Sequence, residues 1–119
     1  MVVEDDETLR NMVARILAEL GEVHAVADGR EALAYLASAN PLPRLVVTDV
    51  MMPHIDGLEL ARRLKAEPRT NRIPIMMLTA KQGAKDLIDG VNAGARLYLT
   101  KPFKVDELKA KAKKAMGLR

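Results

Sequence analysis

The sequence predicts an α/β fold in which a parallel sheet is covered by helices on both faces. Strand-like and helix-like segments alternate along all 119 residues, and this alternation is typical of successive βα units. Residues 45–49 read Leu-Val-Val-Thr-Asp, a short apolar run of the kind that forms a strand buried on both faces. No apolar stretch reaches the roughly 18 residues of a membrane span, so no transmembrane helix is expected.

Five short segments rich in apolar and β-branched residues are expected to be strands. Turn residues or charged residues bound each of them, as is usual for strands. The expected strands are residues 2–3, 23–27, 45–49, 73–79 and 97–100.

Five further segments show the spacing of apolar residues or the end signals that indicate helices. Gly21 and Gly94 are placed to end the first and fourth helices. Asp28 and Glu31 have the spacing of a capping box, which predicts that the second helix begins there. The expected helices are residues 9–20, 29–38, 58–67, 84–93 and 105–116.

Charge is distributed unevenly along the chain, although the formal net charge is only +3. Residues 1–60 carry 4 Lys or Arg and 11 Asp or Glu, whereas residues 61–119 carry 15 and 5. The lysine-rich last helix could contact nucleic acid or present a solvated face, and the second interpretation is favoured. With only 3% aromatic residues, a platform for stacking bases is not expected.

The absence of cysteine excludes a disulfide framework and a thiolate zinc site. The chain also opens without the pattern of a signal peptide. These two features favour a soluble protein in a reducing compartment, and a cytoplasmic location is expected.

Charged and polar residues follow four of the expected strands. Glu4 and Asp5 come after the first strand, Asp49 ends the third, Thr79 ends the fourth, and Lys101 follows the fifth. The carboxyl ends of parallel strands share one edge of the sheet, so these side chains are expected to converge there. Oxygen ligands without His or Cys favour a hard cation, Mg²⁺ or Mn²⁺. The set suits phosphoryl transfer to a carboxylate.

Each of these residues also has a simpler explanation when it is taken alone. An Asp after a strand is commonly a turn residue or a helix N-cap, and an acidic run before a helix complements the helix dipole. Thr79 could simply end a β-branched strand, and Lys101 could be a solvated lysine. Their joint occurrence at four strand ends favours a functional site.

The chain resembles the response-regulator receiver domain of two-component signalling over essentially its whole length. The phosphoacceptor segment of that family resembles residues 48–57, Thr-Asp-Val-Met-Met-Pro-His-Ile-Asp-Gly, and the acidic pair resembles Glu4-Asp5. Residues 78–80 and 101–103 match the switch-hydroxyl and lysine segments. The resemblance implies one receiver domain over residues 1–119. It also implies a doubly wound (βα)5 flavodoxin-like sandwich with a five-stranded parallel sheet in the order 2-1-3-4-5.

The resemblance also implies a role for each residue of the acidic site. Asp49 would accept a phosphoryl group from a histidine kinase, a phosphotransfer protein or a small phosphodonor. Asp5, Asp49 and the backbone carbonyl of Met51 would bind Mg²⁺ directly, and Glu4 would act through a metal-bound water. Lys101 would pair with the phosphoryl oxygens, and its peptide bond to Pro102 would be cis.

Two further residues are expected to transmit the change. Thr79 would move to hydrogen-bond the phosphoryl group, and Tyr98 would be the aromatic residue that turns inward. The output surface would be formed by the fourth helix, the fifth strand and the fifth helix. A downstream protein or a separate output domain would contact it, and nucleic-acid contact by this domain is not expected.

One feature departs from the family pattern, because only Met1, Val2 and Val3 precede Glu4. A shortened central strand predicts lower stability and a tendency towards strand swapping or dimer formation.

Two other functions compete with the signalling switch. One is an interaction module that is not phosphorylated. The other is a phosphohydrolase with an aspartyl-phosphate intermediate, which Met51 disfavours because such enzymes usually have a second acid at that position.

Overall fold

The protein forms a single five-stranded sheet, seen here in a computed structural model that describes residues 1–52, 54–79 and 94–118. All the neighbouring strands are parallel, and their order is β2-β1-β3-β4-β5, which confirms the expected topology. The strands are β1 (Val2–Val3), β2 (Ala25–Val26), β3 (Val46–Asp49), β4 (Ile75–Thr79) and β5 (Leu97–Thr100).

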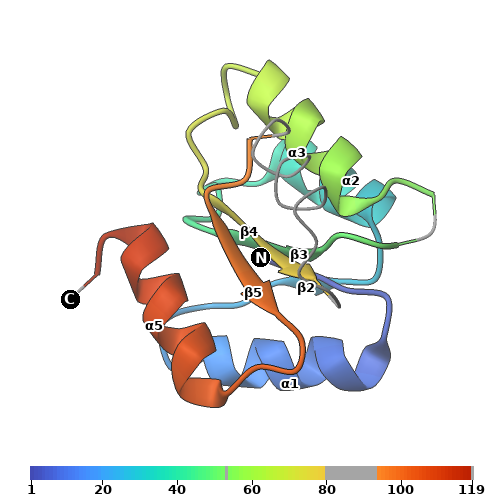
Figure 1. Ribbon diagram of the computed structural model, residues 1–119. Helices are drawn as coiled ribbons and strands as arrows, with labels where there is room; N and C mark the ends of the chain where they lie inside the picture. The colour runs from blue at the N-terminus through green and yellow to red at the C-terminus, as the bar shows by residue number, and fades with distance from the viewer. Residues whose placement is uncertain (53, 80–93, 119) are drawn as a thin grey trace.

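Helices cover both faces of this sheet (Figure 1). The helices α1 and α5 lie on one face, and α2 and α3 lie on the other. Their bounds are α1 (Glu7–Leu17), α2 (Gly29–Ser38), α3 (Gly57–Ala66) and α5 (Val105–Met116). The helix expected at 84–93 lies outside the described residues.

Successive residues of the central strands enter opposite cores. Val2 and Val47 pack with the apolar faces of α1 and α5, whereas Val3 and Val46 pack with those of α2 and α3. Successive side chains of a strand point to opposite faces, so a strand between two helical layers is apolar at most of its positions. This arrangement explains the continuous apolar run that ends at Asp49.

Aspartate side chains begin three of the helices. The carboxylates of Asp6, Asp28 and Asp56 accept hydrogen bonds from backbone N–H groups three residues later, at distances of 3.1, 2.9 and 2.8 Å. Such caps satisfy N–H groups that have no partner within the helix. The predicted capping box is only partly realised, because Glu31 Oε2 accepts from the N–H of Ala27 instead of that of Asp28.

The largest differences between the expected and observed element boundaries fall at three places. The first helix ends at Leu17, and a turn closed by the Leu20 N–H to the Leu17 carbonyl replaces its expected last residues. The second strand shrinks to two residues. The fourth strand begins at Ile75, because Pro74 has no N–H to donate to the ladder.

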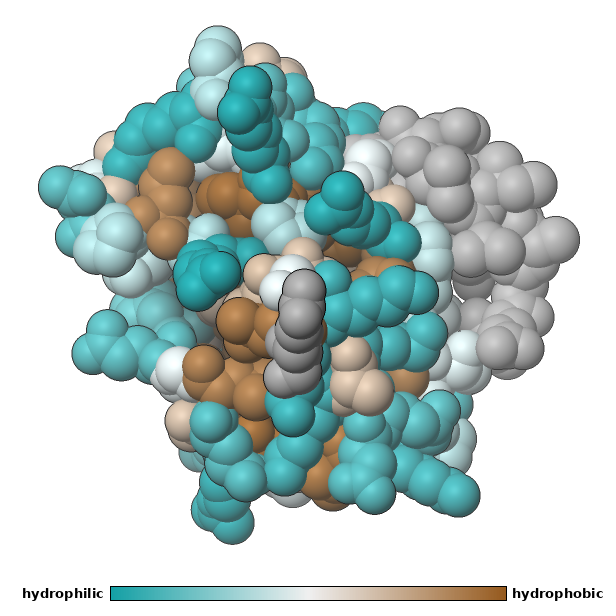
Figure 2. Space-filling view, turned by 90° about the vertical axis from the view of Figure 1, so that its left-hand side faces the viewer, coloured by the Kyte–Doolittle hydropathy of each residue, from teal (hydrophilic) through white to brown (hydrophobic). Residues whose placement is uncertain are grey.

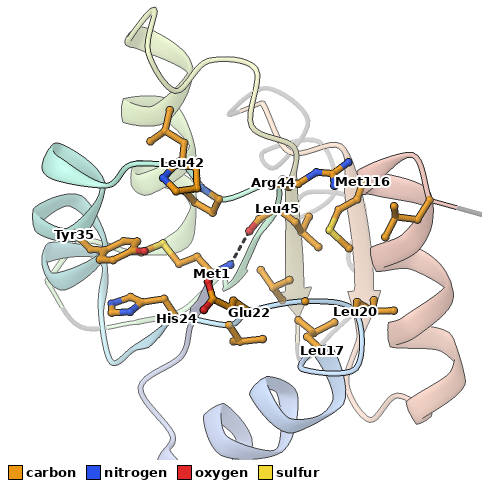
Figure 3. A pocket seen from close by; sticks show the side chains of 16 residues that line it. Met1, Leu17, Leu20, Glu22, His24, Tyr35, Leu42, Arg44, Leu45 and Met116 are labelled. Atoms are coloured by element: carbon orange, nitrogen blue, oxygen red, sulfur yellow. Dashed lines mark hydrogen bonds between the residues drawn. The ribbon is translucent and has the colours of Figure 1, made fainter.

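The short β1 strand remains central because Met1 continues its ladder with β3. The Met1 ammonium donates to the Leu45 carbonyl at 2.8 Å, and the Met1 carbonyl accepts from the Val47 N–H at 2.9 Å (Figure 3). Burial lowers the pKa of this ammonium to about 6. A hollow of about 510 Å³ opens beside Met1 at the edge of the sheet where the strands begin.

The start of α3 lies against the end of β3, and this contact requires a glycine at position 57. A Cβ atom there would lie 2.2 Å from the Asp49 carbonyl oxygen. We expect Gly57→Ala to lower the free energy of unfolding by about 3 kcal/mol, because the clash involves backbone and no rotamer can relieve it. Chemical denaturation measures the loss.

The control is Gly117→Ala, where a Cβ atom would meet nothing within 4 Å and only the positive φ of 73° opposes the change. That strain is expected to cost about 1 kcal/mol. An equal or smaller loss for Gly57→Ala would contradict the close contact between α3 and β3.

Candidate functional site

The ends of four strands supply the site, as the sequence predicts. Glu4 and Asp5 directly follow β1, Asp49 ends β3, Thr79 ends β4, and Lys101 follows β5. The ladder aligns these ends, since Asp49 pairs with Leu78 and Thr79 with Thr100. Residues that are far apart in the sequence therefore meet at one edge of the sheet.

The side chain of Lys101 joins two acidic residues across this edge. Its Nζ atom lies 2.8 Å from Asp49 Oδ2 and 3.3 Å from Glu4 Oε1. The three side chains are 23%, 12% and 1% exposed for Lys101, Asp49 and Glu4. Solvent screens such partly buried charges only weakly, so these contacts count for more than surface ion pairs.

Glu4 is the most deeply buried member of the site. Its Oε2 atom accepts the N–H of Asp6 at 3.1 Å, and its backbone carbonyl accepts from Arg10 Nη1 at 3.0 Å. Burial raises the pKa of Glu4 to about 7, assisted by the charge of Asp49 and opposed by the Asp6 N–H and Lys101. Ionised Glu4 therefore requires more positive charge than Lys101 alone provides.

Lys101 keeps its charge in spite of partial burial. Burial alone would lower the pKa of its ammonium, but the hydrogen bond and charge of Asp49, followed by those of Glu4, raise this pKa above its ordinary value. The site therefore contains a permanent cation beside its carboxylates. An ammonium in this position can also attract a further anionic group.

Three carboxylates of the site are close enough to share a metal ion. One oxygen each from Glu4, Asp5 and Asp49 lies within 4.8 Å of the others. A single ammonium cannot neutralise three carboxylates, and the pKa of Glu4 is raised, chiefly by burial and further by the charge of Asp49. An all-oxygen ligand set suits a hard divalent cation, so this acidic pocket could bind a metal ion.

The loop after β3 orients the Asp49 carboxylate. The N–H of Met51 donates to Asp49 Oδ1 at 3.3 Å, while the Gly57 N–H donates to the Val50 carbonyl at 3.0 Å. The Met51 side chain is 77% exposed and leaves one side of the loop open. Pro53, Ala80 and Lys81 lie outside the described residues.

Thr79 and Tyr98 occupy neighbouring strands beside the site. Thr79 is 9% exposed, and its carbonyl accepts the N–H of Lys101 at 2.7 Å. Tyr98 packs against the core formed with α2 and α3, and burial raises the pKa of its hydroxyl. That hydroxyl is buried without a hydrogen-bond partner among the described residues. The peptide bond between Lys101 and Pro102 is cis, as the resemblance implies.

Two supporting residues were not recognised in the sequence. Asp6 caps α1 through its side chain while its N–H holds the Glu4 carboxylate, and Arg10 binds the Glu4 carbonyl. The acidic run before α1 could have indicated the cap by Asp6, because Asp is a preferred residue at the start of a helix. No local pattern identifies the Arg10 contact, since it depends on how α1 leaves the strand.

Comparison with known proteins identifies the family. The family described as "Response regulator receiver domain" matches residues 1–113. The chain belongs to this family. Receiver domains are signalling modules of two-component systems.

Among relatives, the alkaline phosphatase synthesis transcriptional regulatory protein SphR of Synechococcus elongatus is 42% identical over 95% of this chain and 46% of its own length. Response regulator MprA of Mycolicibacterium vanbaalenii is 43% identical over 93% of the chain and 47% of its own length. The receiver domain therefore spans about half the length of these curated relatives.

Solved structures share the whole fold of this receiver domain. Chemotaxis protein CheY4 of Vibrio cholerae has a TM-score of 0.89 and 31% identity, with 96% of this chain and 94% of that chain covered. A putative response regulator from Chloroflexus aurantiacus has a TM-score of 0.90 and 38% identity, with 98% of this chain and 94% of that chain covered.

In the described part of this chain, no helix has both the length and the apolar character to cross a membrane.

The buried hydroxyl of Tyr98 leads to a test of side-chain placement. We expect Tyr98→Phe to keep or raise the free energy of unfolding, by up to about 2 kcal/mol, because it removes a buried hydroxyl that has no hydrogen-bond partner among the described residues. Chemical denaturation of both proteins measures the change. Thr70→Val is the comparison, since the Thr70 hydroxyl donates to the Leu64 carbonyl at 2.7 Å and its loss should be destabilising. A marked loss of stability in Tyr98→Phe would contradict this placement, because it would show that the hydroxyl has a hydrogen-bond partner.

Proposed function

We propose that this receiver domain is a phosphorylation-dependent switch in which Asp49 accepts a phosphoryl group. The donor would be a histidine kinase, a phosphotransfer protein or a small phosphodonor. The observation that carries the proposal is the placement of the Asp49 carboxylate against Lys101, beside two further acids at one edge of the sheet. A structural ion pair alone would not require the two additional carboxylates.

The chemistry is transfer of a phosphoryl group to an oxygen of Asp49. A carboxylate oxygen forms a bond to phosphorus while the bond between phosphorus and the donor nitrogen or oxygen breaks. The donor atom keeps the electron pair, and no proton has to leave Asp49. Lys101 already lies 2.8 Å from this carboxylate, so its ammonium is placed to pair with oxygens of the incoming group.

A divalent cation, Mg²⁺ or Mn²⁺, fits the oxygen ligands of the site. Asp5, Asp49 and the Met51 backbone carbonyl would hold it directly, and Glu4 would act through a bound water. When bound, the cation neutralises charge on the phosphoryl oxygens. The close approach of the three carboxylates supports this assignment, because a shared cation would compensate their negative charge.

Transmission of the signal would begin at Thr79, whose hydroxyl is proposed to hydrogen-bond the phosphoryl group. Tyr98 lies on the adjacent strand β5, with its ring against the core, and would change its packing when Thr79 moves. The output surface would comprise residues 84–93, β5 and α5.

The partners of this surface would be a downstream protein or an output domain in a longer chain. SphR and response regulator PleD of Caulobacter vibrioides are both longer than the matched region, which covers 46% and 22% of them. Residues 1–119 would act as one receiver domain in the cytoplasm. A dimer of receiver domains remains part of the proposal, because two-fold dimers are the commonest assemblies of soluble proteins.

Phosphorylation can be tested on the isolated domain with acetyl phosphate and Mg²⁺. We expect a mass increase of one phosphoryl group in the native sequence and none in Asp49→Asn, because the nucleophilic carboxylate is lost. Intact-protein mass spectrometry measures the modification. Asp56→Asn is the matched control, since that carboxylate caps α3 and an asparagine can replace it.

Three outcomes would contradict the proposal. A domain that takes up no phosphoryl group would be an interaction module that does not use phosphorylation. Equal modification of the native sequence and Asp49→Asn would place the acceptor elsewhere. Continuous turnover of acetyl phosphate without accumulation of a modified protein would instead indicate a phosphohydrolase.

A further inference from the structure

A second hollow lies at the edge of the sheet where β4 and β5 begin, opposite the edge that carries Asp49. Its volume is about 450 Å³. Figure 2 looks onto this edge of the molecule and shows hydrophilic side chains around a central apolar patch. The hollow is lined by Lys65, Asn71, Arg72, Pro74, Gly94, Ala95 and Arg96.

Three cationic side chains from different parts of the fold line this hollow, and none of its described lining residues is acidic. Lys65 belongs to α3, Arg72 to the loop before β4, and Arg96 immediately precedes β5. Within residues 1–52, 54–79 and 94–118, no ion pair joins any of the three to an acid. The hollow therefore concentrates positive charge that the described residues do not neutralise.

The position of Lys65 is fixed before any ligand arrives. Its Nζ atom donates to the carbonyls of Asn71 at 3.0 Å and Ile73 at 3.1 Å. An ammonium has three donors, so one remains for a ligand. Gly94 allows this placement, because a Cβ atom there would lie 2.5 Å from Lys65 Cγ. Burial, followed by the charge of Arg96, lowers the pKa of Lys65, and a bound anion would oppose both effects.

The chemistry of the lining selects a phosphate group. Guanidinium groups bind phosphate through pairs of parallel hydrogen bonds, and an ammonium adds a compact charge. Arg72 and Arg96 are exposed and lie outside the helices, so their side chains can turn towards a ligand. The volume also exceeds what one phosphate occupies, which leaves room for an attached group.

We propose that the hollow formed by Lys65, Arg72 and Arg96 binds a phosphate group, either free phosphate or the phosphate of a mononucleotide. This site is separate from the Asp49 edge and does not depend on phosphorylation of the domain. Its ligand is held by charge and hydrogen bonds, and no covalent step is involved.

The test is a titration of the ¹⁵N-labelled domain with sodium phosphate, followed by backbone amide signals at constant ionic strength. We expect saturable shifts at Asn71, Gly94 and Arg96. Arg96→Gln should weaken the binding about tenfold, because it removes a charge-assisted interaction. Arg62→Gln is the matched control, since Arg62 is an exposed arginine on α3 that pairs with Glu59, and it should leave the affinity unchanged.

A parallel titration with adenosine monophosphate distinguishes the two sources of phosphate. Tighter binding that is still lost in Arg96→Gln would identify a mononucleotide, and equal affinity would identify free phosphate. Shifts that do not saturate, that sodium chloride reproduces, or that persist unchanged in Arg96→Gln would overturn the proposal. Shifts confined to Thr79 and Lys101 would overturn it too, because they would place the anion at the Asp49 edge.

Discussion

The ammonium of Lys101 is the interaction on which the rest of the candidate site depends. It contacts Asp49 and Glu4, which come from two other strand ends, 52 and 97 positions away in the sequence. These carboxylates are too deeply buried to lie side by side without a cation. Lys101 provides one positive charge, and the pKa of Glu4 is nevertheless raised, chiefly by burial. Three close carboxylates thus share one ammonium among the described residues, a condition that favours binding of a divalent cation.

The scaffold makes this arrangement possible because its sheet is packed on both faces. Strands β1 and β4 are apolar up to the edge where Glu4 and Thr79 appear, and β3 has only the buried Thr48 before Asp49. The apolar residues upstream enter the two cores, and the parallel register brings the ends of β3 and β4 to the same edge. The cap by Asp6 and the close contact at Gly57 then direct α1 and α3 away from the carboxylates. The opposite edge of the same sheet collects cations instead, at Lys65, Arg72 and Arg96.

The resemblance to receiver domains predicted the strand order, whereas the convergence of Glu4, Asp5, Asp49, Thr79 and Lys101 followed from βα alternation and residue type. The sequence also predicted the bounds of α2, β5 and α5, but not the end of α1 or the length of β2. The end of α1 at Leu17 and the brevity of β2 depend on packing between elements, which local spacing does not encode. The support given by Arg10 and the placement of the Tyr98 hydroxyl were missed for the same reason. The Met1 ladder shows that two neighbouring strands can hold a very short central strand.

The most direct measurement is the free energy of unfolding of Lys101→Met, compared with the native sequence in the absence and presence of Mg²⁺. Without Mg²⁺ the variant should be less stable by about 1–3 kcal/mol, because two buried carboxylates lose their shared cation. With Mg²⁺ the difference should shrink, since the ion supplies the missing charge and binds only the folded state. Lys109→Met, which removes an ion pair with the exposed Glu19, should change little in either condition. An undiminished difference in Mg²⁺, or no difference in its absence, would contradict the account.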